Sequence, residues 1–233
     1  GCGHFFLGSQ VANSGACPVC SRNLEDVHAL DNVLELPDAV ARRAGRISAD
    51  EEDRTRRGFD VEPYFRYGSR KSEGELKAGE TAIGKLVYAR EGELILVNHG
   101  FRASDEKGFR YCAKCRTWIA GEESEASHVD EDGRNRCTAG GTEEDVRQGI
   151  RLYVHGFHDF LTLALRAPDG VDPAEFGWSL LYALAYGFEI AYSAEESEIG
   201  CYLFCDPEIE GQIRLLLYEQ DEGGAGLVNH LTE

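Results

Sequence analysis

The chain has 233 residues, of which 42 are acidic and 24 are basic, and its formal net charge is −18. This excess of negative charge opposes broad electrostatic attraction to DNA, so any contact with nucleic acid has to be local. No run of about 18 apolar residues is present to span a membrane, and no apolar signal stretch opens the sequence. We therefore expect a cytoplasmic protein that has no membrane partner.

The first element in chain order is a cluster of potential metal ligands. Cys2 and His4 are followed by Cys17 and Cys20, which lie three positions apart. Two thiols at this spacing can bind one metal ion from a tight turn, which predicts an N-terminal zinc knuckle over residues 1–36. A full knuckle would carry another cysteine three places before Cys2, so the fourth ligand is either His4 or a residue of a longer chain. The absence of methionine also suggests a fragment.

Residues 37–80 are charged and show little periodicity, which predicts a loop-rich linker. Aromatic side chains alternate there with basic ones, a pattern that suits stacking on bases and contact with phosphates of single-stranded DNA. The alternative is a solvated surface loop paired with its own acidic run, Asp50–Asp53. The candidate nucleic-acid contacts are Arg42, Arg43, Arg54, Arg56, Arg57, Tyr64, Phe65 and Arg66, in a stretch that also holds Arg46, Phe59, Tyr67, Arg70 and Lys71.

Residues 81–140 combine a predicted hairpin with a second knuckle. Two strand-like segments, 82–89 and 93–98, flank a predicted turn at 90–92 that contains a glycine. Three cysteines and a histidine then follow at spacings that complete a tetrahedral Zn²⁺ shell. Disulfides are the alternative, but they are typical of small secreted domains. The predicted ligands of this zinc site are Cys112, Cys115, His128 and Cys137.

Residues 141–233 predict the main core. Strands are expected at 150–154, 160–165, 199–204 and 212–218, with a short helix at 224–231. Asp172 and Pro173 form a favourable helix start, and the following apolar residues recur every four positions on one helical face: Phe176, Leu180, Leu184 and Phe188. The sequence thus predicts an α+β fold, a small mixed sheet with packed helices that carries two zinc elements.

Three motifs look like chemical sites but fail on inspection. The segment Gly79–Lys85 has the spacing of a phosphate-binding loop, yet Leu86 replaces the hydroxyl that would reach Mg²⁺. We therefore expect no ATPase activity from this chain itself. Along a continuous strand His155 and His158 would point to opposite faces, and Cys201 and Cys205 would lie about 13 Å apart, too far to pair. The two thiols are expected in the core.

The segment after the last strand joins carboxylates to glycines. Glu219, Asp221 and Glu222 precede residues 223–227, which contain three glycines. Adjacent carboxylates would repel a phosphate, so a nucleotide cradle is disfavoured. The segment predicts either a tight strand-to-helix joint or a carboxylate site for a divalent ion.

The sequence resembles the MrfA-type zinc-binding domain family, found in DEAD/DEAH-box helicases and in DrmB-like proteins of DISARM phage defence. The resemblance covers roughly residues 85–233 and rests on residues 108–115, 179–184, 215–218 and 223–227. Its signature residues are Tyr218, Gly223, Gly224 and Gly226. A cysteine-rich segment that usually follows the glycine joint in helicase members is missing here.

The resemblance implies a zinc-binding accessory domain of a DNA helicase, or of its partner, acting in DNA repair or phage defence. The implied partners are a helicase motor, in cis or in trans, and DNA. Two other functions stay open. One is a metal-dependent nuclease in which Glu219, Asp221 and His158 hold a divalent ion. The other is a protein–protein adaptor, which fits the negative charge and predicts no DNA binding.

Overall fold

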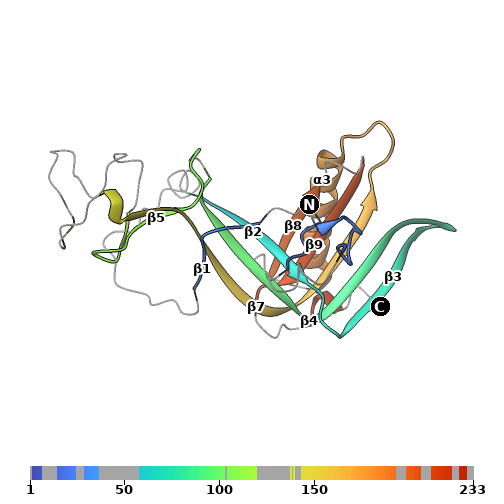
Figure 1. Cartoon of the computed structure of the whole chain (residues 1–233). Coiled ribbons are helices and arrows are strands. Elements are labelled where there is room, and N and C mark those ends of the chain that lie inside the picture. Colours follow the sequence, from blue (N-terminus) through green and yellow to red (C-terminus); the bar gives the residue numbers. More distant parts are fainter. Residues whose placement is uncertain are drawn as a thin grey trace. The chain divides into compact units, whose positions relative to one another are not determined.

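The computed structural model describes residues 2–6, 15–24, 29–36, 58–102, 104–119, 137, 139, 143–192, 198–205, 211–221 and 226–229. These residues contain a mostly antiparallel sheet, one α-helix and one short 3-10 helix (Figure 1), which confirms the α+β fold class. The elements are β1 (Val33–Glu35), β2 (Phe59–Arg66), β3 (Lys71–Ala78), β4 (Thr81–Phe101), β5 (Phe109–Cys112), β6 (Thr117–Ile119), η2 (Glu143–Asp145), β7 (Val146–Arg166), α3 (Pro173–Tyr192), β8 (Ile199–Cys205) and β9 (Gln212–Glu219).

The strands follow the order β2-β4-β7-β5-β6, with β3 paired to β4, β9 paired to both β7 and β8, and β1 paired to β7. The β1–β7 pair is parallel, which makes the sheet mixed. The chain divides into two compact units. The first comprises Gly1–His28, Pro63–Ile95 and Gly156–Glu233, and the second comprises Ala29–Glu62 and Leu96–His155.

The core of the first unit follows from the two-residue period of its strands. Alternate residues of β7 and β9, such as Leu163 and Leu215, lie opposite each other and pack in one apolar cluster with Leu181 and Phe188 of α3. The intervening residues occupy the other face. There Thr162 is buried and Phe160 packs against Phe65 and Tyr67.

Helix α3 begins as the sequence predicts. Asp172 Oδ1 accepts hydrogen bonds of 2.9 Å from the amides of Ala174 and Glu175, which caps the helix and satisfies two of its free N–H groups. The predicted apolar face is also confirmed, because four residues spaced by four pack on the core: Phe176, Leu180, Leu184 and Phe188.

Among the described residues, no helix is long and apolar enough to cross a membrane.

The hairpin predicted around residues 90–92 is wrong, because β4 runs through these residues as one strand. Glu91 adopts φ +50° and its amide donates a hydrogen bond of 2.8 Å to Oδ1 of the buried Asp159. A Cβ at Gly92 would lie 2.3 Å from the Phe160 ring, so only glycine allows the strand to pass this close. Residues 90–92, which have the composition of a turn, therefore form a local irregularity within the long strand β4.

Three further expectations are corrected by the described residues. The loop-rich linker predicted over residues 37–80 contains β2 and β3, and β3 forms a hairpin with β4 in which Ala78 pairs with Thr81. The phosphate-loop-like segment Gly79–Lys85 is therefore the turn and first part of a β-hairpin. The strands expected at 150–154 and 160–165 are parts of the single strand β7, and Cys205 is exposed although Cys201 packs on the core.

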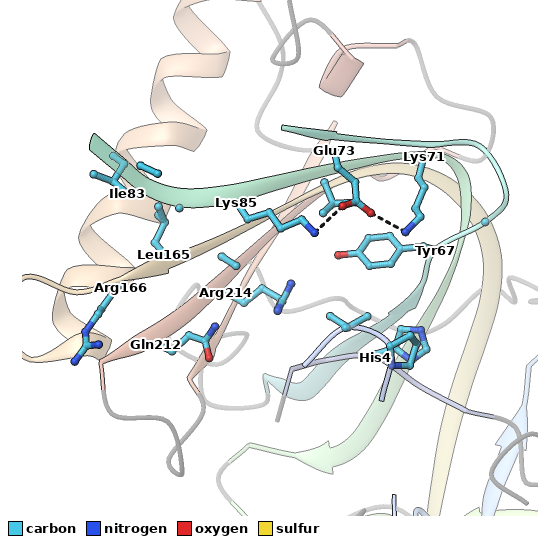
Figure 2. A pocket seen from close by; sticks show the side chains of 17 residues that line it. His4, Tyr67, Lys71, Glu73, Ile83, Lys85, Leu165, Arg166, Gln212 and Arg214 are labelled. Carbon is cyan, nitrogen blue, oxygen red and sulfur yellow. Dashed lines mark hydrogen bonds and ion pairs between the residues drawn. The ribbon is translucent and has the colours of Figure 1, made fainter. Parts of the chain in front are cut away.

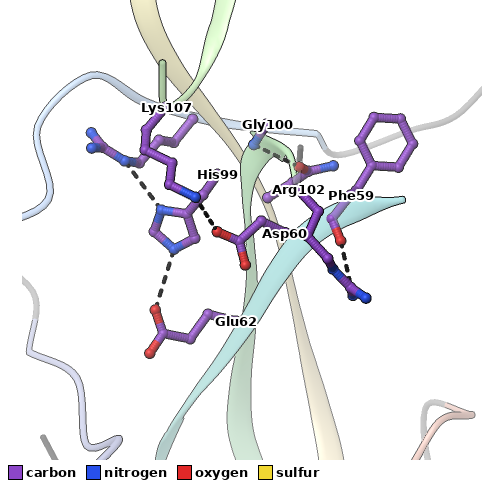
Figure 3. Close-up of polar contacts among 9 residues, drawn as sticks. Phe59, Asp60, Glu62, His99, Gly100, Arg102 and Lys107 are labelled. Atoms are coloured by element: carbon purple, nitrogen blue, oxygen red, sulfur yellow. Dashed lines mark hydrogen bonds and ion pairs between the residues drawn. The ribbon is translucent and has the colours of Figure 1, made fainter. Parts of the chain in front are cut away.

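The second unit contains a polar network between neighbouring strands (Figure 3). Nε of Arg151 donates to Nδ1 of His99 at 3.2 Å, and Nε2 of His99 lies 3.4 Å from Glu62. Beside it, the Lys107 ammonium donates to Asp60 at 2.8 Å, which lowers the pKa of that carboxyl. These contacts stabilise paired strands in the unit that also contains the second cysteine cluster.

Candidate metal centres

The six cysteines of the two predicted knuckles lie in two sets of three. In each set, the three Sγ atoms are all within 4.8 Å of one another. The first set, here called centre 1, is Cys2, Cys17 and Cys20; the second, centre 2, is Cys112, Cys115 and Cys137. The three cysteines that the sequence assigns to each knuckle therefore lie close together in the structure.

The sulfur separations fit a metal ion and not disulfides. Tetrahedral zinc with Zn–S bonds of about 2.3 Å requires sulfurs about 3.8 Å apart, whereas a disulfide bond is about 2.05 Å long. Cys2 and Cys17 have a sulfur separation of 3.8 Å, and Cys112 and Cys137 one of 4.0 Å. None of these six described cysteines forms a disulfide bond. The residues present therefore suit a tetrahedral thiolate site.

Centre 1 is built by a tight turn after an N-terminal segment. The amide of Ser21 donates to the carbonyl of Cys17 at 2.8 Å, which closes the turn, and the amide of Val19 donates to Cys17 Sγ at 3.4 Å. A hydrogen bond between Cys2 and Cys17, together with backbone amides, lowers the pKa of Cys17 to about 5 and raises the pKa of Cys2 above its usual value. A thiol whose anion is stabilised in this way is suited to metal ligation.

Centre 2 lies at the β5–β6 hairpin. Cys112 is the last residue of β5 and is fully buried, and it pairs with Thr117 across the hairpin. The amide of Arg116 donates to the Cys112 carbonyl at 2.9 Å, and the amide of Cys115 approaches Cys112 Sγ at 3.5 Å. This local turn places two thiols on one side of the hairpin, and the buried Cys137 supplies the third.

Three sulfurs leave one position of a tetrahedral shell for a fourth ligand at each centre. His4 is not among the groups gathered around centre 1. Its ring packs near Phe65 and Tyr67, and its buried Nδ1 has no hydrogen-bond partner among the described residues. Burial lowers the pKa of His4. His128, predicted for centre 2, lies outside the described residues.

The predicted nucleic-acid surface is largely outside the described residues, because Arg42, Arg43, Arg54, Arg56 and Arg57 belong to the part of the chain that is not described. The described members make intramolecular contacts. Phe65 is 0% exposed, so it offers no face to a base, and this assignment is corrected. Nε of Arg66 donates to Glu93 at 3.0 Å, and Tyr64 is partly buried.

The carboxylate joint after β9 is a structural anchor. Glu219 is 2% exposed, and its two carboxylate oxygens accept hydrogen bonds from the amides of Gly226 and Val228 at 3.0 and 2.9 Å. The carbonyl of Glu219 lies 2.9 Å from Nδ1 of His158. Among the described residues, Glu219, Asp221 and His158 do not form a metal-ligand group. Sequence reasoning missed this role, since nothing local to Glu219 indicates which amides it will meet.

Comparison with known proteins gives one similar solved structure. No family model matches the sequence, and no curated protein matches it. The chain is similar to a crystal structure of the DUF1998 helicase MrfA bound to DNA, with 12% sequence identity and a TM-score of 0.38. The similarity covers 74% of this chain and 20% of the other, so this chain spans about a fifth of that protein.

Proposed function

We propose that the chain is a zinc-stabilised accessory module that contacts DNA beside a helicase motor. The observation that carries the metal part is the pair of three-cysteine groups, whose sulfur separations of 3.8 and 4.0 Å match a tetrahedral thiolate shell. Each group joins residues that are separated along the chain. Zinc would supply folding energy there and would perform no chemistry.

The role beside a helicase rests on the sequence resemblance to MrfA-type zinc-binding domains. A contact with DNA must also overcome a net charge of −18, which only a local basic surface can do. Repair and phage defence are the two pathways that the resemblance implies. A carboxylate-based nuclease is not proposed, because both Glu219 oxygens already accept backbone hydrogen bonds.

Two measurements test this function. Elemental analysis of protein purified without chelator should find two zinc ions per chain. Fluorescence anisotropy at low salt should then show binding of a labelled single-stranded oligonucleotide, weakening as salt rises because counterions are released from only a few phosphates. Protein that contains no metal would contradict the zinc-stabilised part of the proposal. Protein that does not bind the oligonucleotide at low salt would contradict the contact with DNA.

A second candidate function is a protein–protein adaptor, and one surface feature favours it. Helix α3 presents a row of large apolar side chains spaced by four residues, which places them on one exposed face. Their exposed fractions are 44% for Trp178, 69% for Tyr182, 64% for Tyr186 and 66% for Ile190. Glu175 and Glu189 are on the same helix, so the fitting partner is an apolar protein surface flanked by basic side chains.

A further inference from the structure

A basic pocket in the first unit is the strongest unassigned feature of the described residues (Figure 2). Its volume is about 740 Å³, and among the described residues that line it four side chains are cationic at neutral pH while Glu73 is the single carboxylate. This local excess of positive charge contrasts with the net charge of −18 for the chain. The four cations are Lys71, Lys85, Arg166 and Arg214.

Neighbouring strands place the four cations on the same side of the sheet, although the Arg166 guanidinium points away from the other three (Figure 2). Lys71 lies on β3, Lys85 on β4, Arg166 on β7 and Arg214 on β9. Arg214 lies opposite the small Ala164 in the β7–β9 pair, which leaves room above the sheet. Four strands therefore contribute one cation each to one cavity.

The positive charge is only partly neutralised within the protein. Glu73 lies 2.8 Å from the Lys71 ammonium and 2.6 Å from that of Lys85, and hydrogen bonds from the two lysines lower the pKa of Glu73 to about 2. Nε of Arg214 is shielded from solvent and has no hydrogen-bond partner among the described residues. Glu73 thus meets the charge of the two lysines, and the charge of Arg214 adds to theirs in the same cavity.

One wall of the pocket suits the flat, less polar part of a ligand. Tyr67 lines the cavity together with Ile83 and Val87, and its hydroxyl lies 2.5 Å from Oγ1 of Thr162. Pro18 and Val19 line the cavity too, and these residues form the turn between Cys17 and Cys20 of centre 1. The cavity thus combines fixed cations with an aromatic and aliphatic surface.

We infer that this pocket binds a phosphate-bearing nucleotide unit, with Lys71, Lys85 and Arg214 contacting the phosphate. Glu73 holds the two lysine ammonium groups in place until phosphate oxygens replace its carboxylate. The ligand is either one nucleotide of a single strand or a free nucleotide, since both carry the same phosphate chemistry. This inference identifies the pocket as the place where the proposed module contacts nucleic acid. The assignment of the ligand to a DNA strand rests on the proposed function.

The experiment uses the full chain, a labelled oligothymidylate, ATP and inorganic pyrophosphate at low salt. The Lys85→Gln variant should weaken binding of the phosphate ligand about tenfold, because one charge-assisted hydrogen bond is lost. Lys85 is 58% exposed, so the variant is expected to fold. The matched control is Lys77→Gln, which removes a similarly exposed lysine of the same hairpin outside the pocket and should change binding little.

The Glu73→Gln variant should change the affinity for the phosphate ligand in the opposite direction. It removes the competing carboxylate and should tighten phosphate binding several-fold, whereas a purely structural role of Glu73 would not increase affinity. The assignment of the pocket as a phosphate site would be overturned if Lys85→Gln and Lys77→Gln bound the phosphate ligand equally well, or if Glu73→Gln bound it more weakly than the parent. Tighter binding of ATP than of oligothymidylate would assign the site to a free nucleotide.

The outcomes separate this inference from the proposed function. Oligothymidylate binding that does not depend on Lys85 would keep the DNA-contacting role and reject the pocket. Pyrophosphate binding that depends on Lys85, without any oligothymidylate binding, would keep the pocket and reject the role in DNA contact. Thermal unfolding of each variant checks that a loss of binding does not come from unfolding.

Discussion

The hydroxyl of Tyr88 donates a hydrogen bond of 2.6 Å to Oδ2 of Asp159, a residue 71 positions further along the chain. The other oxygen of the same carboxylate accepts from the amide of Glu91. Asp159 is 7% exposed, so this carboxylate is buried with two partners from β4. One side chain of β7 therefore fixes the irregular part of β4 from inside the protein.

Asp159→Ala should lower the free energy of unfolding by about 1–3 kcal/mol, because the buried Tyr88 hydroxyl and the partly buried Glu91 amide lose their acceptor. Asp159→Asn keeps an acceptor oxygen and should cost less. Urea denaturation measures both, and Asp169→Ala in an exposed turn serves as a control with little effect. Equal stability of Asp159→Ala and the parent would show that the carboxylate does not anchor β4.

The same pair predicts a change in stability at alkaline pH. Burial, together with the hydrogen bond to Asp159, raises the pKa of Tyr88 above its usual value. A raised pKa in the folded protein means that the neutral phenol of Tyr88 contributes to the free energy of unfolding. This contribution is complete below the unfolded pKa of about 10, and it is lost as the pH rises through the pKa of the folded protein. The parent should therefore lose more stability than Tyr88→Phe above about pH 10. Identical pH profiles would contradict this assignment.

The irregularity of β4 shows why the sequence could not predict this part of the fold. Residues 90–92 have the composition of a turn, and only Asp159 and Phe160, far along the chain, keep them in a strand. Strand β3 was also missed, because its residues are mostly exposed and polar and its register comes from pairing with β4. Such determinants are non-local, so a pattern within one segment does not contain them.

Other elements were predictable because their determinants are local. The start of α3 depends on Asp172 and Pro173 and on the spacing of the apolar residues that follow. The cysteine pairs are local too, since a turn of four residues brings Cys112 near Cys115. The basic pocket was not predicted, because its cations lie on four strands and converge only after the strands have paired.

The helix cap of α3 gives a prediction with a close control. Asp172→Ala removes the acceptor of two hydrogen bonds at the helix start and should destabilise the protein by about 1 kcal/mol. Asp172→Asn keeps the side-chain oxygen and should retain most of the stability. Thermal unfolding by circular dichroism compares the three proteins. An equal loss in both variants would indicate that the negative charge, rather than the cap, is responsible.

The exposed row on α3 tests the adaptor function. Tyr182→Asp combined with Tyr186→Asp should leave the free energy of unfolding nearly unchanged, because these side chains are 69% and 64% exposed. Under the adaptor function the same variant should lose binding to the partner helicase in a pull-down with purified proteins. Retained binding would contradict a role of this face in docking. A large loss of stability would show that the row is covered within the protein itself.

The last prediction compares the two metal centres. Pro18 and Val19, between two ligands of centre 1, line the basic pocket, whereas centre 2 belongs to the other unit. Cys17→Ser and Cys112→Ser should each lose about one zinc ion per chain, since each removes a thiolate from a closed site. Only Cys17→Ser should also weaken pyrophosphate binding, because the turn that forms the pocket wall is no longer fixed by metal. Elemental analysis and calorimetric titration with pyrophosphate measure the two effects. Equal losses of pyrophosphate binding in both variants would mean that metal stabilises the whole chain rather than this wall, and a zinc content unchanged by Cys17→Ser would remove centre 1 from the proposal.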